Sequence, residues 1–295
     1  MKKNILLIVN PKSGKMKSKN VFFDIVEGLE SDGSLITTYI TKSKGDATDI
    51  VCKIGKNYDS IVCCGGDGTL NEVVTGMLES ETNIPLGYIP AGTTNDFATT
   101  MNIPKDINQA IDKIVTGTPK AIDIGMMGDD RYFTYIASFG AFTEASYNAP
   151  QQVKNVIGNL AYILEGIKDI ANIRSYNMTV KYDDKEITDE FIFGAVSNST
   201  SIGGLVKLND EYVDLSDGVF EVMLIKNPKT IIDLHKIISS LLYSKFDNDL
   251  ISFFPAKEIE FIMEKPESWT IDGEFAQGDD VVKVKNIHNA IKLII

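Results

Sequence analysis

The chain has 295 residues, and 41 acidic against 29 basic side chains give it a net charge of -12. This length indicates about two domains that each bury a core, and the apolar share of 43% is ordinary for a soluble globular protein. The acidic balance argues against general nucleic-acid binding, which needs a basic face. No apolar stretch approaches the roughly 18 residues that span a bilayer, so any membrane contact must be peripheral.

The first apolar run, residues 5–9, ends at Asn10-Pro11, which is too early for the hydrophobic region of a signal peptide. We interpret it as a core strand. Three cysteines, two of them adjacent at Cys63 and Cys64, make no disulfide framework. We therefore expect a cytoplasmic protein, with peripheral attachment to the inner face of the membrane left open.

Short apolar runs alternate with amphipathic segments through the first domain, which we place at residues 1–120. Strand-helix alternation with short loops predicts an α/β fold, here a doubly wound, mostly parallel sheet with helices on both faces. Ligands of such folds bind at the carboxyl ends of the strands. The expected strands are 5–9, 35–40, 61–64 and 85–89, and the expected helices are 19–30, 46–56 and 70–79.

A β-rich pattern begins near residue 121 and predicts a second, antiparallel β-sandwich-like domain over residues 121–295. Two helical insertions interrupt it, at 150–170 and 228–245. The last strand, 290–295, suits either domain. The expected strands are 121–127, 132–138, 178–182, 191–196, 220–225, 259–263 and 281–284, with turns at Asp183-Asp184, Asp217-Gly218 and Asp272-Gly273.

The most informative segment is the glycine turn Gly65-Gly66-Asp67-Gly68, which joins the buried run 60–62 to a helix expected to start near Thr69. Backbone amides at such a turn and the positive end of the helix dipole bind phosphate. Asp67 would repel phosphate unless Mg²⁺ lies between them. Alternatively, Asp67 caps the helix and the glycines only turn the chain.

Three more strand ends carry polar loops, at residues 10–14, 41–46 and 90–97. Four independent turns could share this composition, because turns favour these residues. In that alternative, Asn95 or Asp96 would cap a helix. Because all four loops should meet at one sheet edge, a common ligand is the better explanation. A local basic patch around Gly14 would either neutralise phosphates or form a solvated face, and it consists of Lys12, Lys15, Lys17 and Lys19.

Two acid-glycine turns mark the second domain. Asp214 and Asp217, three residues apart before a glycine, suit a hard cation such as Mg²⁺, although Asp-Gly is also a common hairpin turn. Glu274 follows Asp272-Gly273 and could act as a base that takes a proton from an attacking alcohol. By itself this second turn would also be an ordinary hairpin.

Taken together, these motifs resemble those of the bacterial diacylglycerol kinase and lipid kinase family. The glycine-aspartate turn is shared with NAD kinases and phosphofructokinases, whereas its combination with the later segments is specific for lipid kinases. The matching segments are Asn10-Pro11-x-Ser13-Gly14, Gly65-Gly66-Asp67-Gly68-Thr69-Leu70-Asn71-Glu72, Gly92-Thr93-x-Asn95-Asp96-Phe97-Ala98, Asp217-Gly218 and Asp272-Gly273-Glu274.

The resemblance implies residue roles. Glu274 would be the proton acceptor, and Asp67 would organise Mg²⁺ near the ATP phosphates. A magnesium ion, catalytic or structural, would bind at Asp214, Asp217 and Val219, the first and third through backbone oxygen. The implied ATP contacts are Asn10, Pro11, Lys12, Ser13, Gly14, Thr41, Gly66, Asp67, Gly68, Thr69, Leu70, Asn71, Glu72 and Thr93.

The implied activity is ATP- and Mg²⁺-dependent phosphorylation of a lipid presented by a membrane, foremost diacylglycerol to phosphatidic acid. Alternatives are another acceptor, such as a sphingoid base, a polyprenol or NAD, or a non-catalytic nucleotide-sensing regulator. The presence of both Asp67 and Glu274 argues against a mere sensor. A homodimer is left open. One apolar stripe either enters the membrane interface or packs on the second domain, and it consists of Val153, Val156, Ile157, Leu160, Ile163, Leu164 and Ile167.

Overall fold

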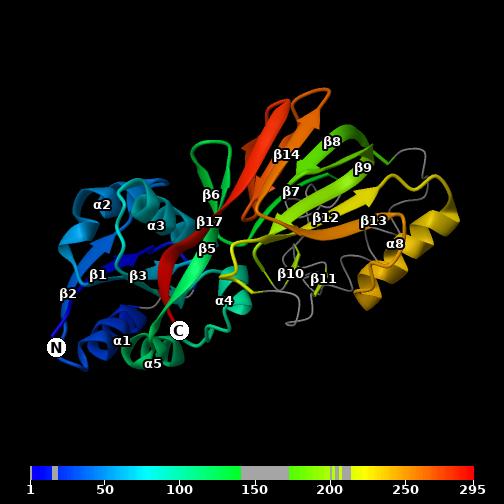
Figure 1. Ribbon diagram of the computed structural model, residues 1–295. Helices are drawn as coiled ribbons and strands as arrows, with labels where there is room; N and C mark the ends of the chain where they lie inside the picture. Colours follow the sequence, from blue (N-terminus) through cyan, green and yellow to red (C-terminus); the bar gives the residue numbers. More distant parts are fainter. Residues whose placement is uncertain (1, 15–18, 141–172, 200, 203–205, 208–213) are drawn as a thin grey trace. The chain divides into compact units, whose positions relative to one another are not determined.

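The computed structural model describes residues 2–14, 19–140, 173–199, 201–202, 206–207 and 214–295 (Figure 1). The chain divides into two compact units. Unit 1 contains Met1–Ile124 and His288–Ile295, and unit 2 contains Gly125–Ile287. The expected insertion at 150–170 with its apolar stripe, and the lysines Lys15 and Lys17, lie outside the described residues.

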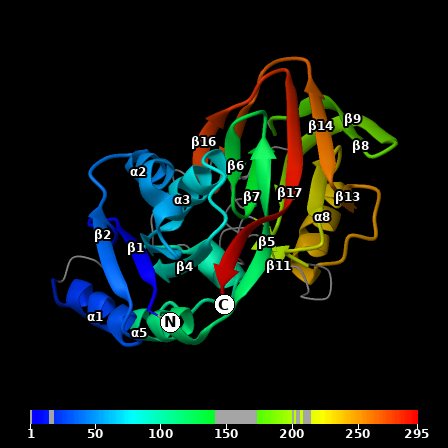
Figure 2. The same ribbon diagram turned by 60° about the vertical axis from the view of Figure 1, so that its left-hand side comes forward.

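Unit 1 is built on a parallel sheet with strand order β2-β1-β3-β4 (Figure 2). The end of a long last strand, β17, joins this sheet because Lys292 and Leu293 pair in parallel with β4. The last strand, which the sequence left unplaced, therefore belongs to unit 1 at its carboxyl end. The bounds are β1 Asn4–Val9, β2 Leu35–Ile40, β3 Ser60–Gly65, β4 Pro85–Pro90 and β17 Val281–Ile294.

Helices cover both faces of this sheet, as the predicted doubly wound fold requires. Helix α2 packs against α3, and α1 packs against α5, on opposite sides of the strands (Figure 1). On the α1/α5 side, Ile25 and Ile111 pack with alternate residues of β1 such as Leu7, which follows from the two-residue period of a strand. The helices are α1 Lys19–Glu30, α2 Asp46–Ile54, α3 Asp67–Glu79, α4 Asp96–Thr100 and α5 Ile107–Thr116, and a 3₁₀ turn, η2, spans Gly55–Asn57.

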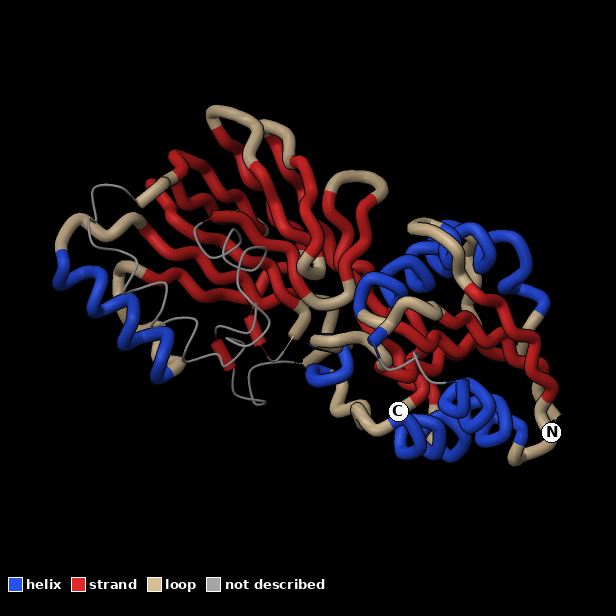
Figure 3. Tube along the Cα trace, turned by 180° about the vertical axis from the view of Figure 1, so that it is seen from behind, coloured by secondary structure: helices blue, strands red, loops and turns tan. Residues whose placement is uncertain are grey.

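Unit 2 consists mainly of antiparallel strands with one described α-helix, α8 (Ile231–Tyr243) (Figure 3). The long strand β9 divides the sheet, because its first half pairs with β8 and its second half pairs with both β7 and β12. Strand β5, Pro119–Met127, begins in unit 1 and ends in unit 2. The other strands of unit 2 are β6 Arg131–Phe133, β7 Ile136–Gly140, β8 Tyr176–Tyr182, β9 Lys185–Ser197, β10 Ser201–Ile202, β11 Val206–Lys207, β12 Phe220–Lys226, β13 Ile251–Ala256, β14 Glu258–Met263, β15 Ser268–Ile271 and β16 Glu274–Gln277.

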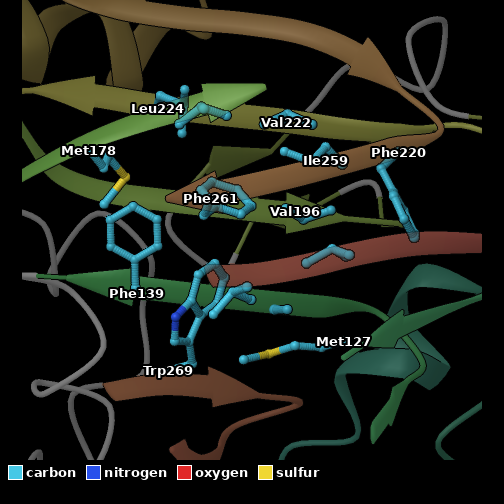
Figure 4. Packing of buried hydrophobic residues seen from close by; sticks show 14 of the residues in the cluster. Met127, Phe139, Met178, Val196, Phe220, Val222, Leu224, Ile259, Phe261 and Trp269 are labelled. Atoms are coloured by element: carbon cyan, nitrogen blue, oxygen red, sulfur yellow. The ribbon is translucent and has the colours of Figure 1, made fainter. Parts of the chain in front are cut away.

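The core of unit 2 centres on three aromatic side chains from three strands (Figure 4). The ring centroids of Phe139 and Phe261 each lie 5.0 Å from that of Trp269. Tilted and edge-on ring contacts at this separation add to the free energy of apolar burial. Gly194 leaves room for this cluster, because a Cβ there would lie 2.3 Å from the Phe139 ring.

Asp272 fixes the hairpin that joins β15 to β16. Its carboxylate is buried and accepts hydrogen bonds from the backbone amides of Thr134, Tyr135 and Ile136 and from the Thr134 hydroxyl, at 2.6–3.1 Å. Burial raises the pKa of Asp272 to about 6, and the four hydrogen bonds oppose this shift. The expected strand 132–138 is therefore two strands, since Thr134 and Tyr135 leave the ladder to bind Asp272.

No helix within the described ranges is both long and apolar enough to cross a bilayer.

Replacing Asp272 with alanine should destabilise unit 2 strongly, because three buried amides would lose their acceptor. We expect the free energy of unfolding to fall by about 3 kcal/mol or more. Asp183→Ala is the matched control, since Asp183 has the same left-handed φ of 47° in an exposed turn and should cost only about 1 kcal/mol. Urea denaturation measures both. Equal losses would contradict the role assigned to the Asp272 carboxylate.

Candidate active site

The loops that follow β1, β2 and β3 meet at the carboxyl edge of the unit 1 sheet. The Asn10 side-chain amide donates to Thr69 Oγ1 at 2.9 Å, which links the first loop to the glycine turn. Asn10 Oδ1 accepts the Lys12 amide at 3.0 Å, and the Thr41 amide donates to the Val9 carbonyl at 2.9 Å. Parallel pairing brings these polar residues together as the sequence predicted.

The fourth loop, after β4, packs directly on the glycine turn. A Cβ on Gly92 would lie 2.6 Å from Gly66 Cα and 2.7 Å from Asn95 Oδ1, whereas a Cβ on Gly66 would lie 3.2 Å from Gly92 Cα. The Ala91 amide also donates to the Gly65 carbonyl at 2.8 Å. The two loops therefore require glycine at their closest approach, and they form one backbone surface.

Asp67 joins two helices. It is the first residue of α3, two residues before the expected start, and its carboxylate accepts the backbone amides of Asp96 at 3.2 Å and Phe97 at 3.3 Å. Asp67 therefore caps α4, so the alternative that it caps its own helix is wrong, whereas its role toward Mg²⁺ stays a prediction. Burial raises the pKa of Asp67, against the effect of these hydrogen bonds.

Asn95 stabilises the loop between β4 and α4 through its side chain. It has a left-handed φ of 53° and occupies the position before α4, yet its side chain makes no capping bond. Instead, Asn95 Oδ1 accepts the Gly92 amide at 3.0 Å and its Nδ2 donates to the Gly92 carbonyl at 2.9 Å. Asn95 thus shapes the loop, and Thr93 is exposed at its tip.

Two of the residues that the resemblance assigned to ATP have side chains engaged elsewhere. The Glu72 carboxylate accepts the Gly45 amide at 2.8 Å and the Ala47 amide at 3.3 Å. It therefore caps α2, where an acidic group is favoured by the helix dipole. The Leu70 side chain is fully buried. These two side chains support the turn from within the unit.

The polar groups that remain at the carboxyl edge of the unit 1 sheet form a candidate phosphate-binding site, called the phosphate seat below. The backbone of Gly66, Gly68 and Thr69 opens α3, and no side chain caps this helix at Gly66. Ser13 is buried, whereas Pro11, Lys12 and Gly14 are exposed, and Asn71 is half-buried on the first turns of α3. Lys19 is the first residue of α1.

The candidate metal residues lie in unit 2. Asp217 Oδ1 accepts the Val219 amide at 3.0 Å, and Asp214 Oδ1 accepts the Ser216 amide at 3.1 Å. Within the described ranges, no three acidic, histidine or cysteine side chains gather as a metal site. The resemblance implies backbone oxygen from positions 214 and 219 beside the Asp217 carboxylate, a donor set that suits a hard cation.

Glu221 is an additional acid near this loop that the sequence reading missed. It is 5% exposed, and its Oε2 has no hydrogen-bond partner in the described part of the chain. Burial raises the pKa of Glu221 to about 8, and the charges of Asp217 and Asp214 add to this shift. The available signal was an acid within the apolar strand β12.

Glu274 is the first residue of β16 and is exposed. The preceding Asp272 and Gly273 have φ values of 47° and 81°, so a tight turn presents Glu274. The hydrogen bonds that the Asp272 carboxylate accepts hold the start of that turn in place. Glu274 and the candidate metal residues belong to unit 2, whereas the phosphate seat belongs to unit 1.

Comparison with known proteins decides the family. A sequence profile described as the diacylglycerol kinase catalytic domain matches residues 4–127. The diacylglycerol kinase of Bacillus subtilis is 32% identical over 97% of this chain and 95% of its own length. The chain belongs to the diacylglycerol kinase family. It is therefore a lipid kinase, and the family resemblance inferred from the sequence motifs is confirmed.

A further relative and a solved structure point to the same family. The diacylglycerol kinase of Staphylococcus saprophyticus is 35% identical over 77% of this chain and 74% of its own length. A crystal structure of a candidate diacylglycerol kinase from Bacillus anthracis has a TM-score of 0.82 and 26% identity, and covers 100% of this chain and 97% of that one. The expected fold class, with a parallel first sheet and an antiparallel second region, is confirmed.

The close contact between Gly66 and Gly92 predicts that a larger residue at position 92 lowers the stability of this kinase. Gly92→Ala should lower the free energy of unfolding by about 2 kcal/mol, because the new methyl overlaps the glycine turn. Gly14→Ala is the matched control, since a Cβ there meets no described atom within 4 Å, and it should change stability by less than about 0.5 kcal/mol. Thermal and urea unfolding measure both. A Gly92→Ala protein as stable as Gly14→Ala would contradict the close packing.

Proposed function

We propose that this lipid kinase transfers the terminal phosphoryl group of ATP to the free hydroxyl of diacylglycerol, giving phosphatidic acid. The observation that carries the proposal is the glycine turn before α3, which Asp67 ties to the first amides of α4 while Asn95 shapes the loop before that helix. The names of the relatives support diacylglycerol as the acceptor. Each relative's name describes that protein, so the acceptor for this chain is inferred.

The phosphate seat would act by positioning the phosphates of ATP. The amides of Gly66, Gly68 and Thr69 open α3 and can donate to phosphate oxygens, aided by the helix dipole. Because α4 fixes the Asp67 carboxylate, its orientation is set before a nucleotide binds. Phosphoryl transfer needs little covalent help from the protein, so such preorganisation carries most of the catalysis.

Mg²⁺ suits the acidic oxygen donors of this chain, with Asp67 near the phosphates and the Asp214, Asp217 and Val219 loop in unit 2. When bound, it would supply charge neutralisation for the phosphates. The buried Oε2 atom of Glu221, without a hydrogen-bond partner in the described residues, is consistent with a cation close to that loop.

Glu274 would take the proton from the attacking hydroxyl. It is exposed at the start of β16 on a turn that Asp272 makes rigid. A positioned carboxylate of this kind serves as a general base.

The test of the function is an acceptor panel with labelled ATP. Diacylglycerol, monoacylglycerol, sphingosine, ceramide and undecaprenol are presented in mixed micelles, and NAD in buffer. Diacylglycerol should be labelled fastest, and only with Mg²⁺ present. Preferred labelling of another acceptor would replace diacylglycerol, and ATP binding without transfer to any acceptor would favour a nucleotide sensor.

Two substitutions test the assigned groups. Asp67→Asn and Glu274→Gln should each lower kcat by about 100-fold or more. Thermal unfolding should change little in Glu274→Gln, because Glu274 is exposed. Asp67→Asn should also lower stability, because one of its two acceptor oxygens becomes an NH2 group that faces an α4 amide. Glu72→Gln and Glu264→Gln are the matched controls, since Glu72 caps α2 and Glu264 is an exposed acid of unit 2. Their kcat should stay near that of the wild type. Near-normal turnover in Asp67→Asn or Glu274→Gln would remove that residue from the mechanism.

A further inference from the structure

Strand β12 buries an acidic residue among apolar ones. Glu221 is 5% exposed and lies between Phe220 and Val222, which both belong to the unit 2 core (Figure 4). Glu221 pairs with Ser197 of β9 on one side and with Pro255 of β13 on the other, so neighbouring strands enclose it. Its Oε2 atom has no hydrogen-bond partner in the described residues. A buried carboxylate oxygen without a donor is costly, and a bound ion or water is one explanation for it.

A second buried oxygen without a donor belongs to Asn286 on β17. The Asn286 side-chain amide donates to the Val219 carbonyl at 3.2 Å, two residues before Glu221. The Oδ1 atom of Asn286 is buried, and it has no hydrogen-bond partner among the described residues. Val219 itself is held by Asp217, whose Oδ1 accepts the Val219 amide at 3.0 Å. Both oxygens therefore belong to side chains next to the loop that would hold the cation.

Glu221 and the two loop acids concentrate negative charge at this place. Burial raises the pKa of Glu221 to about 8, and the charges of Asp217 and Asp214 add to this shift, so both acids lie within electrostatic reach of it. In the part of the chain that the structure describes, no ion pair neutralises any of the three. The three carboxylates do not converge as direct ligands within the described ranges. A cation bound by the loop would therefore act on Glu221 from outside its direct ligands.

A hydrated cation accounts for these features together. Mg²⁺ binds few protein oxygens and keeps several of its waters, and the hydrogens of those waters need acceptors. We propose that the Glu221 carboxylate accepts hydrogen bonds from the hydration shell of an ion in the loop of residues 214–219, and that its charge sets the affinity for that ion. Acceptors in this outer position commonly determine how tightly a metal binds. Asn286 orients the Val219 carbonyl and offers a second acceptor.

The role of Glu221 rests on the proposed function, because it concerns the ion proposed there, but ion binding itself needs neither ATP nor lipid. Glu221 also lies outside the motifs that carry the family resemblance. The alternative partner of its carboxylate is a cationic side chain from a segment outside the described residues. A protein cation would stabilise Glu221 at all times, whereas a bound ion would stabilise it only when the ion is supplied.

Calorimetric titration of Mg²⁺ into EDTA-treated protein tests the proposal without nucleotide. Glu221→Gln keeps the size of the side chain and removes its charge, so it should weaken Mg²⁺ binding by about tenfold or more. Asp217→Asn should remove the same binding heat, which identifies the loop as the site. Glu264→Gln is the matched control, because Glu264 is an exposed acid of the same unit, and it should bind Mg²⁺ as the wild type does.

Thermal unfolding gives a readout that a merely structural glutamate would not move. Mg²⁺ should raise the unfolding temperature of the wild type by about 5 °C, and most of this gain should disappear in Glu221→Gln. In EDTA the variant should unfold at or above the wild-type temperature, because a neutral amide needs no counter-charge. A variant that loses stability equally with and without Mg²⁺ would overturn the proposal, since Glu221 would then pair with a group of the protein.

The remaining outcomes separate the role of Glu221 from catalysis. If the wild type labels no lipid but its Mg²⁺ affinity still depends on Glu221, the proposed function fails and the role of Glu221 stands. A Glu221→Gln protein that binds Mg²⁺ as tightly as the wild type would overturn the role, even if diacylglycerol is labelled. A wild type that binds no Mg²⁺ without nucleotide would overturn it as well.

Discussion

The hydrogen bonds from the α4 amides to the Asp67 carboxylate are the interaction on which the phosphate seat depends. They connect the turn after β3 to the loop after β4, and the close approach of Gly66 and Gly92 completes the junction. Because Asp67 is held by a second helix, the acidic side chain has a fixed place at the glycine turn. Burial raises the pKa of Asp67, and the amide donors, which favour the charged form, oppose this shift in part.

Long-range acidic caps recur through the molecule. Glu72 reaches the start of α2, and Asp272 gathers three amides that lie far earlier in the chain. In each case a carboxylate satisfies backbone donors that a loop or helix start would otherwise leave unpaired. The result is that both the glycine turn and the turn before Glu274 are rigid. Rigid turns suit a phosphoryl transfer that depends on position and charge.

The residue pattern correctly predicted those helices and strands whose bounds depend only on neighbouring residues in the sequence. The helix Lys19–Glu30 and the strand Leu35–Ile40 have the expected bounds, since periodicity alone determines them. The break at Thr134 was not predictable, because its partner Asp272 is distant in sequence. Strand β13 was missed because its exposed Pro255 disguises an edge strand that pairs with β12. The motifs located the glycine turn before α3, whereas the contact made by Asp67 required the structure.

Hydrogen exchange with a non-hydrolysable ATP analogue and Mg²⁺ tests the central claim most directly. If the strand-end loops of unit 1 form one nucleotide seat, amides in 65–71 and 91–97 should gain protection together. The β8–β9 turn at Asp183 should not change. Protection confined to one of the two loops, or found only in unit 2, would contradict the claim that the Asp67 junction makes them a single site.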